Sequence, residues 1–331
     1  MSIILVTGGA GFIGSNIVAR LAARSDIDVA VCDYFGAADD GKWRNLAKHP
    51  VMDFVEPAHL DGYLRDRAGA ISAIVHMGAI SATTETDVDL IVRTNQILTR
   101  RLWDWCANER IPFVYASSAA TYGDGEHGFT DDNSFEALQK LRPLNAYGWS
   151  KYAFDLFAIR SAARGHMPPH WAGLKFFNVY GPNEQHKGGQ KSVVAHMYPK
   201  AAAREPVTLF RSHNPNYSDG GQLRDFIYVK DCADVVEWLL TAERTAGIVN
   251  VGTGKARTFS DLAASLYAAL GQSPNIQFVD TPVTIREKYQ YFTEADMSRL
   301  RVLGYEKQFT PIEAGVADYV TRYLASEDPH A

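Results

Sequence analysis

The sequence predicts an α/β protein built on a doubly wound parallel sheet, with a smaller α/β domain interleaved toward the C-terminal half. Short apolar runs, which are typical of buried strands, alternate with longer stretches of helical periodicity. A glycine-rich turn joins the first apolar run to the first of those stretches. A length of 331 residues allows about two domains, and 46% hydrophobic against 21% charged residues is an ordinary globular composition.

The N-terminal residues predict a strand, a turn, a helix and a second strand. Residues 3–6 are apolar and are followed by the glycines of residues 8–11. Residues 12–24 carry their apolar side chains at helical spacing, and residues 29–32 form another apolar run that ends at Asp33.

The alternation of strands and helices continues along the chain. We expect further strands at residues 73–76, 112–116, 174–177 and 248–251, and helices at about 88–108, 145–164, 226–246 and 259–270. Residues 183–225 contain many glycines and prolines, so loops and short elements are expected there. No linker separates the halves, and we expect two interleaved domains, residues 1–177 plus about 226–255, and about 178–225 plus 256–331.

Composition narrows the class of protein. The 33 Lys and Arg against 38 Asp and Glu give a net charge of −5 without long blocks of one sign, which argues against a nucleic-acid partner. No apolar run approaches the ~18 residues of a membrane span, and Met1 leads directly into a strand, so a cytoplasmic protein is expected. Cys32, Cys106 and Cys232 are scattered in apolar runs, as buried thiols are, and the ten histidines do not cluster at metal-binding spacing.

The glycine-rich turn predicts a dinucleotide site. Residues 7–14 read Thr-Gly-Gly-Ala-Gly-Phe-Ile-Gly, and Gly8, Gly11 and Gly14 stand where a strand passes into a helix. Glycines let a pyrophosphate approach backbone amides at the helix N-terminus, where the helix dipole favours negative charge.

The residues after the second strand bear on the choice between NAD and NADP. Asp33 follows the glycines at about the distance of the carboxylate that binds the adenosine ribose, which favours NAD. Lys42 and Arg44 come soon after it and either reach a 2′-phosphate or are solvated loop side chains. These residues alone leave the choice open.

Tyr147 and Lys151 are candidates for proton transfer. They are four residues apart, on one face of an expected helix, although such a pair also arises by chance. A phenol titrates near pH 10, and a neighbouring ammonium group lowers that pKa by stabilising the phenolate. Ser118 follows a buried strand, at the sheet edge where ligands bind, and its hydroxyl is placed to bond a reacting oxygen.

These motifs combine into a family resemblance that covers nearly the whole chain. With residues 117–123 (Ser-Ser-Ala-Ala-Thr-Tyr-Gly) and 224–231 (Arg-Asp-Phe-Ile-Tyr-Val-Lys-Asp), they resemble the extended short-chain dehydrogenase/reductases that act on nucleotide sugars. The resemblance implies a Ser118, Tyr147 and Lys151 triad and a bound nicotinamide cofactor.

Residues 76–85, 177–188 and 288–296 are similar, more narrowly, to the ADP-glycero-manno-heptose 6-epimerase family, which serves lipopolysaccharide inner-core synthesis. This resemblance implies a homo-oligomer, often a pentamer, that holds NADP tightly. Beside Gly8, Gly11 and Gly14, the implied cofactor site is Phe12, Ile13, Asp33, Tyr34, Lys42, Met77, Gly78, Ala79, Ile80, Ser81, Asn95, Lys151 and Val179. The implied substrate site is Asn178, Gly189, His196, Phe210, Arg211, Ser212, His213, Arg224 and Tyr289.

The chemistry that the resemblance implies gives Lys187 and Arg224 roles. Oxidation at C6 gives a 6-keto sugar, rotation about C5–C6 presents its other face, and the hydride returns there. A second acid/base is then useful because the oxygen has moved, and Lys187 is a candidate, its alternative being a mobile surface lysine. Arg224 would bind the diphosphate, its alternative being a salt bridge to Asp225 or Asp231.

Several departures from the family pattern concern the substrate more than the reaction. Met77 stands where an acidic residue is usual, Gly189 replaces a serine, Pro57 stands where a lysine is common, and residues 211–223 form a longer segment.

Three other functions were weighed against the 6-epimerase. A UDP-hexose 4-epimerase would share the triad, and only the segment around Lys187 argues against it. A dehydratase needs an acid/base pair where this chain has Ala119 and Ala120. A non-catalytic NAD(P) sensor would have no need of Tyr147 and Lys151.

Overall fold

The computed structural model describes residues 2–241, 246–286 and 289–331. Met1, Lys288 and the part of the expected 226–246 helix at residues 242–245 lie outside the described residues. No helix within the described ranges is both long enough and apolar enough to cross a membrane.

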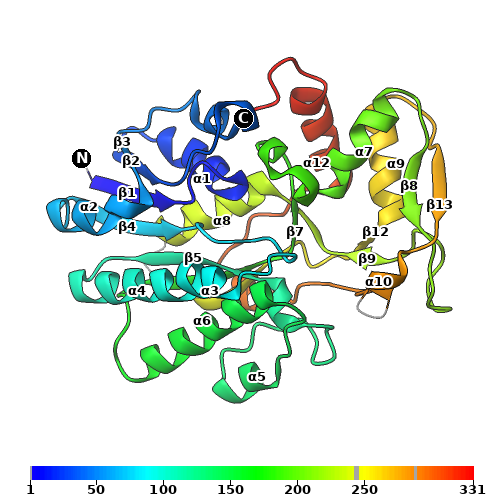
Figure 1. Ribbon diagram of the computed structural model, residues 1–331. Helices are drawn as coiled ribbons and strands as arrows, with labels where there is room; N and C mark the ends of the chain where they lie inside the picture. Colours follow the sequence, from blue (N-terminus) through cyan, green and yellow to red (C-terminus); the bar gives the residue numbers. More distant parts are fainter. Residues whose placement is uncertain (1, 242–245, 287–288) are drawn as a thin grey trace.

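A seven-stranded parallel sheet forms the centre of the larger part of the molecule, in the order β11-β6-β5-β4-β1-β2-β3 (Figure 1). Its strands are β1 (Ser2–Thr7), β2 (Ile27–Cys32), β3 (Asp53–Val55), β4 (Ile71–His76), β5 (Phe113–Ser118), β6 (Trp171–Phe176) and β11 (Gly247–Val251). The order reverses direction at β1 and β4, and a crevice therefore opens beyond their carboxyl ends. This is the Rossmann-type, doubly wound arrangement that the sequence predicts.

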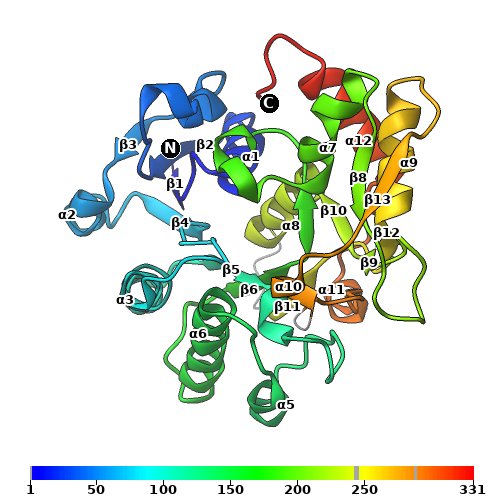
Figure 2. The same ribbon diagram turned by 45° about the vertical axis from the view of Figure 1, so that its right-hand side comes forward.

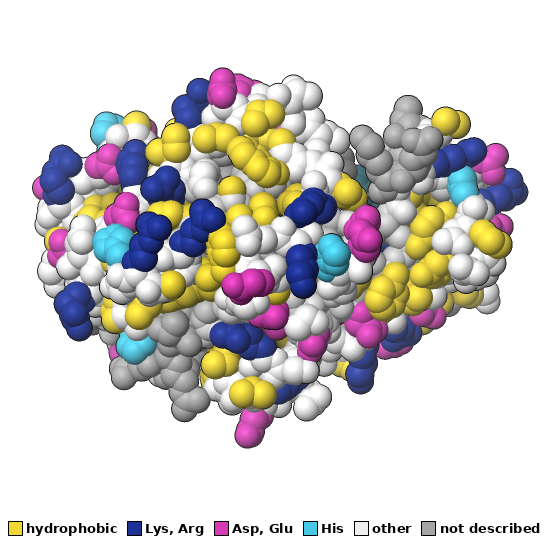
Figure 3. Space-filling model, turned by 90° about the horizontal axis from the view of Figure 1, so that it is seen from below, with side chains coloured by type: hydrophobic (Ala, Val, Ile, Leu, Met, Phe, Trp, Pro, Cys, Tyr) yellow, Lys and Arg dark blue, Asp and Glu magenta, His cyan; other side chains and the backbone are white. Residues whose placement is uncertain are grey.

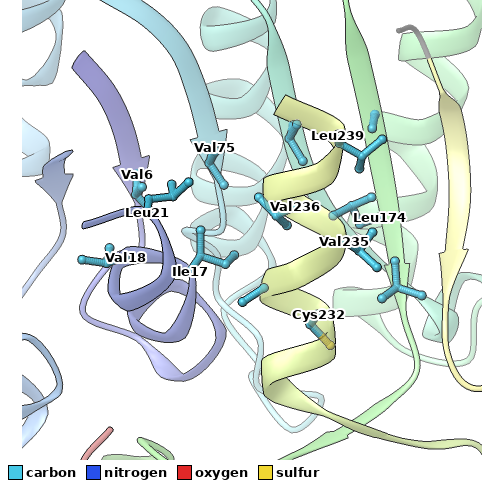
Figure 4. Packing of buried hydrophobic residues seen from close by; sticks show 14 of the residues in the cluster. Val6, Ile17, Val18, Leu21, Val75, Leu174, Cys232, Val235, Val236 and Leu239 are labelled. Carbon is cyan, nitrogen blue, oxygen red and sulfur yellow. The ribbon is translucent and has the colours of Figure 1, made fainter. Parts of the chain in front are cut away.

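Alternate residues of each strand face opposite sides, so the sheet carries two separate cores. Figure 4 shows the first, in which Val6 of the sheet packs with Leu21 of α1 (Phe12–Ala22) and Val236 of α8 (Val229–Thr241). The three cysteines are buried, as expected, with Cys232 in this core and the other two in the core on the opposite face.

The second core is covered by α2 (Leu60–Asp66), at the left in Figure 1, and by the helices on the lower side of that view. In this core Trp103 and Phe154 pack edge to face with ring centroids 6.1 Å apart. The lower helices are α3 (Val88–Ile91), a π-helical turn η4 (Val92–Ile97), α4 (Leu98–Glu109), α5 (Phe135–Lys140) and α6 (Ala146–Ala163). The expected helix at 88–108 is thus three helical segments, of which the middle one is π-helical.

A smaller α/β part packs beside the carboxyl edge of the sheet, on the right in Figure 1. Its principal elements are α7 (Val193–Ala202), α9 (Phe259–Ala269), α12 (Ile312–Tyr319), β8 (Val207–Phe210) and β13 (Ile276–Val279). The remaining short strands and helices are β7 (Asn178–Tyr180), β9 (Leu223–Arg224), β10 (Phe226–Tyr228), β12 (Arg257–Thr258), α10 (Val283–Arg286) and α11 (Ser298–Val302). Single turns occur at η1 (Ala38–Asp40), η2 (Lys42–Leu46), η3 (Pro57–His59), η5 (Ala119–Tyr122), η6 (Gln185–Gln190) and η7 (Val320–Leu324).

The structure differs from the sequence expectations at several elements. Phe226–Tyr228 form a strand, so the expected 226–246 helix begins at Val229. The ten-residue α7 lies within the expected loop region, where the Ser192 hydroxyl caps it by accepting a hydrogen bond from the Ala195 amide at 3.3 Å. Leu300 of α11 is buried in the same core as Val6 of β1 and Val236 of α8.

Candidate active site

A large pocket opens at the carboxyl ends of the central strands, between the sheet and the smaller part of the molecule. Its volume is about 1130 Å³, which exceeds the ~300–1,000 Å³ of most small-molecule sites and leaves room for two ligands side by side. Its walls include these predicted site residues: Gly8, Gly11, Phe12, Ile13, Gly14, Asp33, Lys42, Met77, Gly78, Ala79, Ser81, Ser118, Tyr147, Lys151, Asn178, Val179, Lys187 and Gly189.

The glycine loop is shaped to receive a ligand against its backbone. Gly8 has a φ of +67°, and a Cβ placed on it would lie 2.5 Å from the Gly78 amide nitrogen. A Cβ on Gly14 would lie 2.1 Å from the Gly8 carbonyl oxygen. Only glycine fits at both positions, and residues 11–14 at the start of α1 line the pocket, so the loop fits a dinucleotide pyrophosphate.

Asp33 and Lys42 form an ion pair at the end of the pocket nearest β2. One Asp33 oxygen accepts a hydrogen bond from the Ala10 amide at 2.9 Å, and the other accepts one from the Lys42 ammonium at 2.8 Å. The Lys42 ammonium also donates to the Tyr34 carbonyl. Arg44 lies over the Trp43 ring at 5.6 Å and is not among the pocket residues, so of the two candidates Lys42 and Arg44 it is Lys42 that lines the pocket.

Ser118 and Tyr147 meet at the floor of the pocket. Asn145 caps α6 by accepting a hydrogen bond from the Gly148 amide at 2.8 Å, which places Tyr147 in the first turn. The Ser118 hydroxyl oxygen accepts a hydrogen bond from the Ala120 amide at 3.1 Å, and both Ser118 and Tyr147 line the pocket.

The pKa of Tyr147 does not follow our expectation. Burial raises the pKa of this phenol, and the hydrogen bond to Ser118 only partly opposes that rise. Burial also lowers the pKa of Lys151 to about 8, against a smaller opposing effect of Asp155. The expected lowering is absent because removal from water destabilises the phenolate and the ammonium alike.

Asp155 is a buried carboxylate that we did not predict at this site. It lies one helical turn beyond Lys151 and forms an ion pair with Lys175 on β6 at 2.9 Å, and both side chains are fully buried. It also accepts hydrogen bonds from Tyr115 at 2.9 Å and Ser117 at 2.8 Å, both on β5. The spacing of Asp155 from Lys151 is the signal that could have revealed it, since both lie on one helix face.

Asn95 lies in the π-helical turn, and its side-chain amide makes its hydrogen bonds with other residues of the protein. Its amide oxygen accepts from the Ile80 amide at 2.8 Å, and its amide nitrogen donates to the Ile80 carbonyl at 2.9 Å and to the Ser150 hydroxyl at 3.0 Å. Neither Asn95 nor Ile80 is among the residues that line the pocket. Asn95 instead ties the 77–81 loop to the helix that carries Tyr147.

Lys187 lines the pocket beside the start of α1, with its ammonium nitrogen 5.3 Å from the centre of the Phe12 ring. Burial lowers its pKa, and the neighbouring Glu184 carboxylate opposes that shift. Glu184 is itself buried and accepts hydrogen bonds from the Ser192 hydroxyl at 2.6 Å and the Tyr319 hydroxyl at 2.9 Å. Lys187 is therefore a half-buried amine held at the cofactor end of the pocket, not a mobile surface side chain.

Arg224 is a buried cation that has no carboxylate partner among the described residues. It is 9% exposed and donates hydrogen bonds to the Leu223 carbonyl at 2.8 Å and to the Gln290 carbonyl. The alternative of a salt bridge to Asp225 or Asp231 is wrong, because Asp225 accepts from residues 253, 254 and 295 and Asp231 from residue 310. Burial lowers the pKa of Arg224.

The other expected substrate residues lie beyond the walls of this pocket. Phe210, Tyr289 and Tyr291 form an edge-to-face aromatic group next to Arg224, with ring centroids 6.3 and 5.3 Å apart. Tyr34 of the expected cofactor site does not line this pocket. The same holds for these residues of the expected substrate site: His196, Phe210, Arg211, Ser212, His213, Arg224 and Tyr289. The 211–223 segment begins beside β13, where the Arg211 amide donates to the Val279 carbonyl at 2.8 Å and its guanidinium faces Asp280 at 3.4 Å.

Comparison with known proteins identifies the family. The NAD dependent epimerase/dehydratase family matches residues 4–252. A protein of Nitratidesulfovibrio vulgaris (strain Hildenborough) named ADP-L-glycero-D-manno-heptose-6-epimerase is 46% identical over 98% of this chain and 99% of its own length. A protein of the same name from Fusobacterium nucleatum is 44% identical over 99% of each chain.

A solved structure agrees with these relatives. The crystal structure of Helicobacter pylori ADP-L-glycero-D-manno-heptose-6-epimerase superposes with a TM-score of 0.78 at 27% identity, covering 97% of this chain and 96% of that one. The chain belongs to the NAD dependent epimerase/dehydratase family, in the group of its relatives named ADP-L-glycero-D-manno-heptose-6-epimerase.

Proposed function

We propose that the protein is an isomerase that interconverts ADP-D-glycero- and ADP-L-glycero-manno-heptose by inversion at C6. The observation that carries the proposal is that two proton-transfer candidates, Tyr147 and Lys187, line the same pocket. Tyr147 lies on the floor beside Ser118, and Lys187 approaches over Phe12. An inversion in which the reacting oxygen changes its place uses one acid/base before the change and another after it.

A bound nicotinamide would supply the hydride acceptor and donor at C6. On this proposal the phenolate form of Tyr147, a minor form in the free protein because burial raises its pKa, takes the hydroxyl proton as a 6-keto sugar forms, and Ser118 hydrogen-bonds the same oxygen. After rotation about C5–C6 the ketone oxygen faces Lys187, which returns a proton. The lowered pKa of Lys187 supports this role, because an amine that titrates nearer neutrality donates and accepts protons readily.

We propose that Arg224 binds the diphosphate of the sugar nucleotide. A buried guanidinium without a carboxylate is costly unless an anion occupies the space beside it, and a diphosphate supplies that charge. Tyr289 and Phe210 would flank the nucleoside. On this proposal, residues 1–177 with about 226–255 hold the cofactor, and residues 178–225 with 256–331 hold the nucleotide sugar.

The cofactor that we propose is NADP, with NAD as the alternative. Asp33 alone favours the free ribose of NAD, but its carboxylate is already paired with Lys42. A 2′-phosphate at this end would meet the Lys42 ammonium, which supports NADP.

We further propose a cytoplasmic homo-oligomer, a pentamer by resemblance, that serves lipopolysaccharide precursor synthesis. Figure 3 views the face below α4 and α6, where hydrophobic side chains lie among basic ones. Ile97 and Trp149 expose 49% and 44% of their surface. Apolar side chains of this size are covered when copies of a chain associate. Light scattering coupled to size-exclusion chromatography would give the number of subunits.

The function is tested by incubating each ADP-heptose epimer with the purified protein and following both by NMR. We expect the same equilibrium mixture from either epimer. Tyr147→Phe and Lys187→Met should each lower the rate by about 100-fold or more, as loss of an acid/base group does. Lys200→Met, an exposed change on α7, should match the wild type. Turnover of UDP-galactose without heptose conversion would establish the 4-epimerase instead.

A further inference from the structure

The segment that follows α12 runs back from the smaller part of the molecule to the first elements of the larger part. In Figures 1 and 2 this red segment ends beside the blue segments around α1. His330 near its end is only 6% exposed, although no helix or strand includes it. A buried polar side chain in an irregular segment needs specific partners.

Three residues of the larger part bind this segment. The His330 ring donates from Nδ1 to the Asn45 amide oxygen at 2.8 Å. The Lys48 ammonium donates to the His330 carbonyl at 2.7 Å, and the His49 ring contacts the Ala331 carbonyl at 3.1 Å. The direction of the first bond is fixed because the Asn45 amide nitrogen donates elsewhere, so its oxygen must face His330.

The same segment also holds the start of the loop that carries Lys187. The Ala331 amide donates to the Asn183 side-chain oxygen at 2.8 Å, and the Gln185 side chain donates to the Pro329 carbonyl at 3.3 Å. Asn183 is fully buried with a φ of +74°, a conformation that costs a non-glycine residue free energy and persists only where its surroundings hold it.

Asn45 joins these contacts to the cofactor loop. Its amide nitrogen donates to the Ala10 carbonyl at 2.9 Å and to the Asn183 carbonyl at 3.2 Å, and it lies 3.3 Å from the His186 ring nitrogen. One buried amide therefore contacts the glycine loop and two residues of the Lys187 loop while it receives the hydrogen bond of His330.

We propose that residues 328–331 are a strap that positions the 183–187 segment, so that Lys187 lies over the cofactor end of the pocket. The effect of the strap on catalysis rests on the acid/base role proposed for Lys187 above. The loop's other anchor, Glu184 with Ser192 and Tyr319, lies in the smaller part of the molecule. On the side of the larger part, Ser15 and Asn45 bind Asn183 directly, and the strap adds its bonds to Asn183 and Gln185. None of the strap residues lines the pocket, so the strap acts through the residues that it binds.

The strap is tested by hydrogen exchange of the backbone amides of residues 184–192 in the full chain with its cofactor. His330→Leu removes the donor and keeps an apolar side chain in the site, and we expect about fivefold faster exchange in this loop, as loss of one buried hydrogen bond allows. His330→Asn places an amide donor close to the position of Nδ1 and should restore wild-type exchange. Glu327→Gln, an exposed neighbour, should leave exchange unchanged.

The kinetic readout separates positioning from general stability. His330→Leu should lower kcat severalfold while KM for the nucleotide sugar stays within twofold, because the strap does not contact the substrate. If His330→Leu fails to fold, Gln185→Ala removes the bond to Pro329 from the loop side and should give the same pattern. Unchanged loop exchange, or an equal rise in β4 and β5, would overturn the strap. If His330→Leu speeds exchange in residues 184–192 alone, but the wild-type protein does not convert the ADP-heptose epimers, the strap is supported and the proposed function is rejected.

Discussion

Asp155 and Lys175 make the buried ion pair that fixes the helix of Tyr147 and Lys151 to the sheet. We expect Asp155→Asn to lower the free energy of unfolding by about 3–5 kcal/mol, because it leaves the Lys175 ammonium buried without its counter-charge. Lys175 retains a hydrogen bond to Thr121 and lies 4.6 Å from the centre of the Tyr122 ring, and these contacts do not replace a carboxylate.

The double variant Asp155→Asn with Lys175→Met tests this reasoning. It removes both charges and should recover most of the lost stability, to within about 1–2 kcal/mol of the wild type. Asp61→Asn is the matched control, since it breaks an exposed ion pair with Arg101 and should cost less than about 1 kcal/mol.

Urea unfolding followed by tryptophan fluorescence measures all four proteins at one pH. A double variant as unstable as Asp155→Asn would refute the reasoning. That result would place the cost in the hydrogen bonds of Tyr115 and Ser117 to the carboxylate and not in the unpaired charge.

Three further predictions concern the cofactor loop, the buried arginine and the titration of Lys151. Gly14→Ala should yield protein without copurifying nicotinamide, seen in its absorbance spectrum, because the new Cβ would meet the Gly8 carbonyl; retained cofactor would contradict this. Arg224→Met should raise KM for the nucleotide sugar about 10- to 100-fold with little change in kcat, whereas Arg322→Met at an exposed position of η7 should not; equal KM values would reject the diphosphate site. The pKa of Lys151 is about 8 in the folded chain and about 10.5 ordinarily, so between these two pH values the folded chain binds fewer protons at Lys151 than the unfolded chain does. The free energy of unfolding of the wild type, compared with that of Lys151→Met, should therefore rise with pH by about 3 kcal/mol over this range. If the free energies of unfolding of the two proteins change in parallel with pH, the shift is absent.

Much of the sheet was predictable because a buried parallel strand must be a short apolar run. The strands at residues 3–6, 29–32 and 73–76 therefore appear within one or two residues of their expected ends. β3 was missed because three edge residues, one of them an exposed Phe54, carry no such pattern. α7 was missed because its glycine- and proline-rich surroundings outweigh the single cap at Ser192.

The candidate site was predictable where local sequence determines geometry. The glycine loop and the spacing of Tyr147 and Lys151 are of this kind, and the pocket brings them together. The pKa of Tyr147 was not predictable, because burial by the folded chain outweighs the ammonium expected to assist it. The ion pair of Asp155 with Lys175 joins residues twenty positions apart, and only the sheet register shows that they meet.

Inversion at C6 through a ketone is the central claim, and the most direct measurement follows deuterium placed at C6. ADP-D-glycero-manno-heptose that carries deuterium at C6 would be incubated with the purified protein in ordinary water, and the product examined by NMR. The proposed chemistry predicts the L epimer with the deuterium still at C6, because the same hydride returns to the carbon that it left. Loss of the deuterium to water, or the absence of any C6 epimer, would contradict it.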